Sequence, residues 1–139
     1  MGSNTKKDIV LVIDDDPEIR DALEVACHMH GYEVRMANDE HEALACMEDY
    51  APALVLIDYY GIADDTGELV QRIKALDSRV PIVLMSGAQE CREKMKLLGL
   101  TQHMAKPFSM ETLLKTLKKC GIRSKRKVAA EPLAFSLFA

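Results

Sequence analysis

Four short polar stretches, each placed close after an apolar run, carry the side chains best suited to chemistry. They supply the carboxylates of Asp14, Asp15 and Asp58, the hydroxyl of Ser86 and the amine of Lys106. Carboxylates that lie close together repel one another, so one of them must take up a proton or share a cation. A few carboxylates open to solvent suit Mg²⁺, which keeps several of its own waters. A metal at such a site attracts phosphate, an amine neutralises the phosphate charge, and an aspartate can attack phosphorus.

These residues need elements that bring them together, and the apolar pattern predicts strands that alternate with helices. The apolar runs are short and rich in β-branched residues, which is typical of buried strands. The segments between them have apolar residues at helical spacing, with start signals such as Asp16-Pro17 and glycine at the ends. The expected strands are 8–13, 32–36, 53–57, 80–85 and 101–105. The expected helices run from Asp16 to Gly31, from Asn38 or Asp39 to Tyr50, over 68–76 and 89–98, and onward from Ser109.

Regular alternation of strand and helix predicts an α/β fold, with a five-stranded parallel sheet, helices on both faces and right-handed crossovers. In such a sheet, ligands bind beyond the carboxyl ends of the strands, where the strand order reverses. The polar residues follow strands one, three, four and five, so we expect them to converge there. Taken alone, each has an ordinary explanation as a helix start, a turn or a loop. Together, on these strand ends, they favour a phosphoryl-transfer site.

Several segments resemble the receiver domain of two-component response regulators, in particular the single-domain regulators of chemotaxis. The resemblance extends over residues 8–120 and rests on VLVIDDDPEIR, LVLID, VLMSGA and KPF. It implies a flavodoxin-like, doubly wound sheet with the strand order 2-1-3-4-5. It also implies a role for each matching residue: Asp58 as phosphoacceptor; Asp14, Asp15, Asp58 and the backbone carbonyl of Tyr60 as Mg²⁺ ligands; Ser86 and Lys106 as phosphoryl contacts; and a cis peptide bond before Pro107.

Two features depart from the family pattern. The segment after Asp58 reads YYGIADDTG, which lacks the proline usual there and places Gly67 one residue late. His103 stands at the position where a tyrosine or phenylalanine switch residue is common. For His103, a structural role and a role in signalling both stay open.

The composition limits the classes of function. The chain of 139 residues has 48% hydrophobic and 29% charged residues, which fits one soluble globular domain. Its net charge of -4 and the lack of Trp argue weakly against nucleic-acid binding. No segment resembles a signal peptide or a membrane span, so we expect a cytoplasmic protein. The four cysteines lack the spacing of a zinc site or a disulfide framework, so we expect reduced thiols.

These observations together predict a receiver domain over residues 1–120. We expect Mg²⁺-dependent transfer of a phosphoryl group to Asp58 from a sensor histidine kinase or a phosphotransfer protein. The chain would catalyse only its own phosphorylation and dephosphorylation, and its output would be contact with a protein partner. One alternative is a receiver-like interaction module that no longer takes phosphate. A second is a haloacid-dehalogenase-like phosphatase. That family has a second aspartate two residues after the nucleophile, where this chain has Tyr60.

The remaining residues, 121–139, are predicted to form a C-terminal tail. The tail reads GIRSKRKVAAEPLAFSLFA, with a basic run followed by an apolar end. It is too short for a DNA-binding or catalytic output domain, and its basic run suits the C-terminal end of a helix. Three interpretations stay open for the apolar end: disorder, packing on the protein's own or a neighbour's surface, and a docking peptide.

Overall fold

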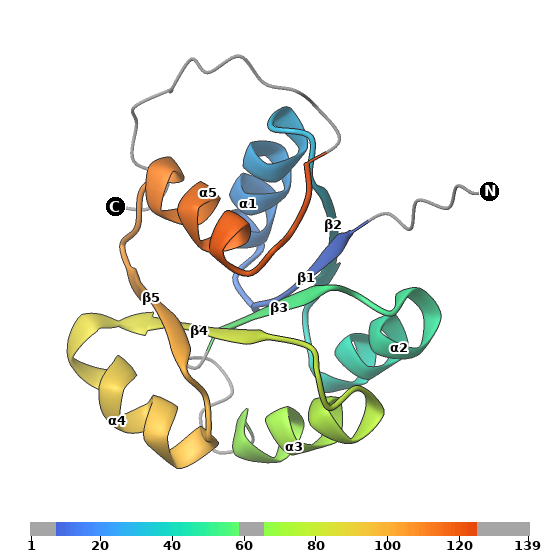
Figure 1. The fold of residues 1–139 in the computed structure, drawn as a ribbon, viewed down its shortest axis with the longest axis vertical. Helices are drawn as coiled ribbons and strands as arrows, with labels where there is room; N and C mark the ends of the chain where they lie inside the picture. Colours follow the sequence, from blue (N-terminus) through green and yellow to red (C-terminus); the bar gives the residue numbers. More distant parts are fainter. Residues whose placement is uncertain (1–7, 59–65, 125–139) are drawn as a thin grey trace.

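The computed structural model describes residues 8–58 and 66–124, except for the side chains of residues 88–92. Strands and helices alternate throughout these residues (Figure 1). The strands are β1 (Ile9–Ile13), β2 (Glu33–Ala37), β3 (Leu54–Asp58), β4 (Ile82–Gly87) and β5 (Gln102–Lys106). The helices are α1 (Pro17–Met29), α2 (Glu40–Tyr50), α3 (Thr66–Leu76), α4 (Ala88–Leu98) and α5 (Met110–Lys119).

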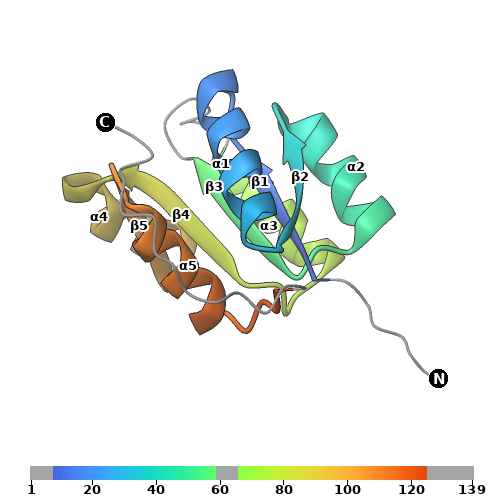
Figure 2. The ribbon, with the colours of Figure 1, turned by 90° about the horizontal axis from the view of Figure 1, so that it is seen from above.

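The strands form one parallel sheet in the order β2-β1-β3-β4-β5, which confirms the predicted order. Helices α1 and α5 cover one face of the sheet, and α2, α3 and α4 cover the other (Figure 1). Figure 2 looks onto the first face, with α1 and α5 in front of the strands. The predicted α/β architecture is therefore confirmed. No described helix combines the length and the hydropathy that a membrane span needs.

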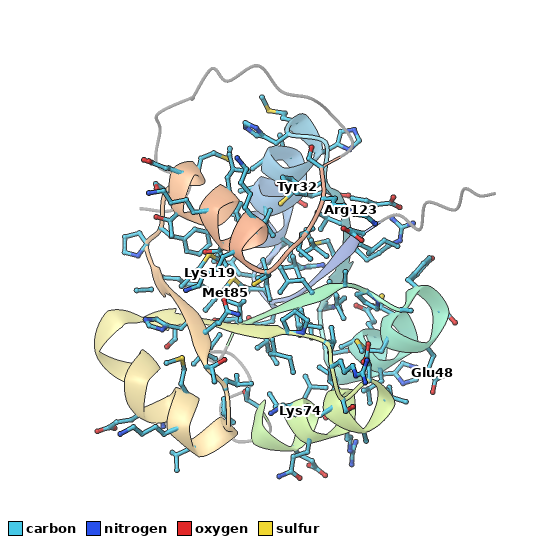
Figure 3. The ribbon with its side chains drawn as sticks, in the orientation of Figure 1. Tyr32, Glu48, Lys74, Met85, Lys119 and Arg123 are labelled. Atoms are coloured by element: carbon cyan, nitrogen blue, oxygen red, sulfur yellow. The ribbon has the colours of Figure 1, made fainter. Side chains whose placement is uncertain are left out.

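Alternating side chains of the strands fill two cores, one on each face. Val10 and Val12 of β1 lie in the core with α1 and α5, whereas Leu11 and Ile13 lie in the core with α2 and α3. Met85 of β4, labelled in Figure 3, belongs to the first core. Because both faces are covered, the central strands are apolar at successive positions and show no alternation with polar residues.

Three helices end in the same way, with a left-handed glycine followed by a buried apolar residue. These pairs are Gly31-Tyr32 after α1, Gly99-Leu100 after α4 and Gly121-Ile122 after α5. In each pair the backbone N–H of the apolar residue donates to the carbonyl five residues earlier. This arrangement satisfies carbonyls of the last turn and packs the apolar side chain against it. The cap after α5 lies inside the predicted tail.

The predicted helix starts at Asp16, Asp39 and Ser109 are confirmed. Each side chain accepts a hydrogen bond from a backbone N–H two or three residues later. A helix leaves its first N–H groups without internal partners, and these side chains supply one. The last of the three starts α5 directly after the turn that follows Lys106, so it helps to fix the direction of the chain there.

Several elements extend beyond their predicted bounds. Ser86 and Gly87 pair with Ala105 and Lys106 and belong to β4, whereas the sequence predicts them after the strand. Lys106 is likewise the last residue of β5. Helix α3 begins at Thr66, two residues before the predicted start. In the two strands, backbone pairing continues past the last apolar side chain, which the apolar pattern does not register. In α3, the helix begins before its first apolar position.

Residues 121–124, which we call the C-terminal strap, close the amino end of the sheet, where the strands begin. Ile122 is 5% exposed and lies in the core with α1 and α5. The backbone N–H and Nε of Arg123 both donate to Asp8 Oδ2, at 2.7 and 3.3 Å. Ser124 Oγ donates to the carbonyl of His30 at 2.5 Å. The described part of the predicted tail thus packs on the domain, and residues 125–139 lie outside the described residues.

The described cysteines are free thiols. Cys27 is buried in the core, and this burial raises the pKa of its thiol to about 12. Cys46 and Cys120 are half-buried, and burial raises the pKa of each of them as well. The thiolate is the reactive form of cysteine, so these residues are suited to packing and poorly suited to nucleophilic chemistry.

Candidate functional site

Four polar residues reach the carboxyl end of the sheet from four different strands. Asp14 directly follows β1, Asp58 ends β3, Ser86 is the next-to-last residue of β4, and Lys106 ends β5. The strands are parallel, so these residues lie at the same end of the sheet. Strands β1 and β3 are neighbours at the point where the strand order reverses, which is where open α/β sheets bind ligands.

Three carboxylates form an acidic cluster at this end. Oxygens of Asp14, Asp15 and Asp58 all lie within 4.8 Å of one another. Asp14 and Asp58 are 1% and 4% exposed, whereas Asp15 is exposed to solvent. Two buried carboxylates at this distance repel each other and are poorly hydrated, so they need a positive partner.

Lys106 provides positive charge between the two buried carboxylates. Its Nζ lies 3.3 Å from Asp14 Oδ2 and 3.1 Å from Asp58 Oδ1. The lysine side chain is 22% exposed, so its ammonium group keeps some access to water. The amine that the sequence predicts near the acidic residues is therefore in direct contact with two of them.

The backbone orients Asp14 from both sides. Its N–H donates to the carbonyl of Ala37 at the end of β2, and its Oδ1 accepts from the N–H of Asp16 at 2.9 Å. Burial raises the pKa of the Asp14 carboxyl above its ordinary value, and the nearby charge of Asp58 adds to this. The hydrogen bond from Asp16 and the charge of Lys106 act in the opposite direction. The cluster thus contains a carboxyl that is costly to keep ionised.

The other predicted site residues have different surroundings. Ser86 is 2% exposed, and the Lys106–Pro107 peptide bond is cis. His103 is exposed on β5, an outer strand of the sheet, three residues before Lys106. The predicted carbonyl ligand, that of Tyr60, lies outside the described residues.

One interaction in the site was not predicted from the sequence. The hydrogen bond from the Asp16 N–H to Asp14 is a side-chain turn of the kind that aspartate often forms with the backbone two residues on. The signal for it is the Asp-x-Asp spacing within DDD. This turn fixes the Asp14 carboxylate on the acidic cluster while Asp16 starts helix α1.

The donor set fits a hard divalent cation. Three carboxylates within 4.8 Å offer oxygen ligands, and the exposure of Asp15 leaves an open path to water. Mg²⁺ prefers oxygen ligands and retains waters, so it matches a partly open cluster of this kind. Zinc sites, by contrast, usually include His or Cys ligands, and the described cluster has neither.

Comparisons with known proteins agree with this arrangement. The chemotaxis protein CheY4 of Vibrio cholerae is 30% identical with a TM-score of 0.73, and the match covers 82% of this chain and 98% of that one. A CheY-like receiver domain protein of Methanospirillum hungatei is 25% identical with a TM-score of 0.72, covering 81% and 92% of the two chains.

Among curated proteins, the response regulator MprA of Mycobacterium leprae is 29% identical over 129 residues, which are 91% of this chain and 57% of that protein. The chain spans about half the length of the curated relatives it matches. The family model described as response regulator receiver domain matches residues 10–118. The chain therefore belongs to the receiver domain family of two-component response regulators.

Proposed function

We propose that this receiver domain accepts a phosphoryl group on Asp58. Receiver domains are signalling modules of phosphorelays and not classical enzymes. The observation that carries the proposal is the contact of Lys106 Nζ with Asp58 Oδ1, 3.1 Å apart, inside a cluster of three carboxylates. Among the three, Asp58 is the one that ends the central strand β3.

The donor in this proposal is a phosphohistidine on a histidine kinase or a phosphotransfer protein. A carboxylate oxygen of Asp58 attacks phosphorus, and the phosphorus–nitrogen bond of the donor breaks. The imidazole leaves with the bonding electron pair, and an acyl phosphate forms on Asp58. Lys106 is placed to pair with the phosphoryl oxygens, and the Ser86 hydroxyl can donate a hydrogen bond to one of them. Attack of water on phosphorus breaks its bond to the Asp58 oxygen, releases inorganic phosphate and restores the aspartate.

The proposal includes Mg²⁺ as a cofactor. Asp14, Asp15 and Asp58 would hold it, together with the backbone carbonyl of Tyr60. When bound, the ion neutralises negative charge on the phosphoryl oxygens. Asp14 is suited to this task because its carboxylate is oriented by the N–H of Asp16 and lies within 4.8 Å of oxygens of Asp15 and Asp58.

We further propose that the output is contact with a protein partner. A phosphoryl group shifts a conformational equilibrium only through contacts that differ between two states. Ser86 and Lys106 lie on adjacent strands that pair with one another, so β4 and the edge strand β5 can respond together. His103, exposed on β5 three residues before Lys106, is the candidate switch residue on this path.

Phosphorylation with a small donor tests the chemistry. Incubation with acetyl phosphate and Mg²⁺ should add one acid-labile phosphoryl group, detected by intact mass. Asp58→Asn should abolish the labelling because an amide is a poor nucleophile. Asp21→Asn, which removes an exposed carboxylate on α1, is the matched control and should be labelled like the parent.

Labelling of Asp58→Asn, or labelling that persists in EDTA, would refute the assignment of acceptor or metal respectively. A folded parent chain that takes no label would favour the alternative of a phosphorylation-independent interaction module. Membership of the receiver family argues against the phosphatase alternative.

A further inference from the structure

The C-terminal strap fixes where the chain leaves the described fold. Ser124 Oγ bonds to the carbonyl of His30, the residue that caps the end of α1. Arg123, labelled in Figure 3, is held on Asp8 at the start of β1. The chain therefore continues into residue 125 from a point beside the C-terminal end of α1.

Among the described side chains, α1 has more large exposed apolar residues than any other helix. Val25 is 59% exposed and Met29 is 46% exposed, and Asp21 lies one turn before Val25. Residues at four-residue spacing lie on one helix face, so we call Asp21, Val25 and Met29 the α1 stripe. In the described parts of α2, α3 and α4, each helix has one large exposed apolar residue, namely Tyr50, Leu76 and Leu97.

Acidic side chains border this apolar surface. Asp21 and Glu24 are both exposed, and among the described residues neither carboxylate forms an ion pair. A segment that binds the α1 stripe should therefore combine apolar side chains with positive charge.

The sequence after the strap has that chemistry. Lys125, Arg126 and Lys127 come first, and four large apolar residues follow, which are Leu133, Phe135, Leu137 and Phe138. Leu133 is nine residues beyond Ser124, a separation that spans up to about 30 Å when extended at ~3.3 Å per residue. Helix α1 has 13 residues and is about 20 Å long at ~1.5 Å per residue. The apolar residues can therefore reach any part of the stripe.

We propose that residues 125–139 dock on the α1 stripe of the same chain. The basic residues would pair with Asp21 and Glu24, and the apolar residues would cover Val25 and Met29. A short tether gives an effective concentration of the order of millimolar, so contacts of modest strength suffice to populate the docked state. A docked tail would block the access of other proteins to the α1 stripe. The docking does not depend on phosphoryl transfer to Asp58.

Photo-cross-linking in the full chain tests this contact. Phe135 is replaced by p-benzoylphenylalanine, and in a second protein Leu137 is replaced in the same way. Irradiation at low protein concentration should give an intramolecular cross-link, which mass spectrometry of the digest should locate on the α1 peptide containing Val25 and Met29. Val25→Glu should lower the yield several-fold, because it adds a charge where an apolar side chain is needed.

Leu97→Glu is the matched control. It places the same charge on a more exposed apolar position, 78% exposed on α4, and should leave the yield unchanged. Circular dichroism confirms that both variants fold, as expected for substitutions at exposed positions. Three outcomes overturn the proposal: no cross-link from either position, cross-links outside α1, or cross-links only between two chains with a yield that rises with concentration.

Discussion

The two ends of the sheet hold their polar groups in opposite ways. At the carboxyl end, Asp14 and Asp58 are 1% and 4% exposed and share the amine of Lys106. At the amino end, the Asp8–Arg123 pair joins an Asp8 side chain that is 16% exposed to an Arg123 side chain that is 74% exposed. There it is the apolar Ile122, and not a charge, that is buried.

The two ends therefore contribute differently to the stability of the fold. Burying a carboxylate costs free energy unless enough positive charge compensates it, whereas an exposed ion pair contributes little in either direction. Buried apolar surface contributes about 25 cal/mol per Å². Burial of Asp14 and Asp58 therefore opposes folding to the extent that Lys106 does not compensate it, whereas burial of Ile122 stabilises the fold. Three predictions follow from this contrast.

The largest effect is expected at the amino end. Ile122→Ala should lower the free energy of unfolding by about 3 kcal/mol, because it removes a buried side chain and leaves a cavity. Urea denaturation followed by circular dichroism measures this change. Leu97→Ala removes a similar side chain at a position that is 78% exposed, and should change the stability by less than about 0.5 kcal/mol. Equal effects of the two substitutions would contradict a structural role for the strap.

A smaller effect of opposite sign is expected at the carboxyl end. The pKa of Asp14 is raised in the folded state, so ionisation of this group costs stability as the pH rises above 3.8, its ordinary value. Asp14→Asn should therefore stabilise the fold at neutral pH, by an amount of the order of 1 kcal/mol. The gain should shrink as the pH falls towards that ordinary value, because the parent carboxyl is then protonated.

Thermal unfolding in EDTA at several pH values measures the effect of Asp14→Asn. Lys106→Met provides the companion measurement, since it removes positive charge from the same carboxylates and should destabilise the fold at neutral pH. In the double variant, Lys106→Met should lower the free energy of unfolding by less than it does in the parent chain. A loss of stability in Asp14→Asn at neutral pH would show that the buried charge is well compensated.

The smallest effect is expected for the Asp8–Arg123 ion pair. Arg123→Gln should lower the free energy of unfolding by less than about 1 kcal/mol, because the Arg123 side chain is 74% exposed and the backbone N–H of residue 123 still donates to Asp8. Asp8→Ala removes both hydrogen bonds and should lower the free energy of unfolding more than Arg123→Gln does. Denaturation in low and high salt measures both. A large, salt-dependent loss in Arg123→Gln would mean that the amino end also relies on charge.

The sequence predicts the fold well because local signals and apolar periodicity agree. Asp16, Asp39 and Ser109 are confirmed as helix caps. The strand order is confirmed as well, but it was implied by the family resemblance and not by these local signals. The predicted strand ends are less accurate at Ser86 and Lys106. The sequence places both residues after their strands, but in the structure both still pair within the sheet. Side chains at a functional site are polar, so they resemble loop residues even where the backbone is still paired.

The sequence does not predict the contacts of the strap, although the strap has a local signal. Gly121-Ile122 follows α5 as Gly31-Tyr32 follows α1, and both pairs form the same cap. The sequence identifies the glycine as a helix end, but the burial of Ile122 depends on the surface that α1 and α5 create together. The contact between Asp8 and Arg123 joins residues 115 positions apart, and no local pattern can indicate it. In the candidate site, the predicted carbonyl of Tyr60 stays a prediction.

The hydrogen bonds between Arg123 and Asp8 also bear on how this fold can be combined with other sequences. They bring the first and last parts of the described fold into contact, at the end of the sheet away from the acidic cluster. A domain whose ends meet can be inserted into a host protein through one short junction, or rejoined and opened elsewhere, with little distortion. Both connections would then emerge on the side opposite Asp58, leaving that carboxylate accessible. This geometry thus suits the receiver domain to insertion into other proteins.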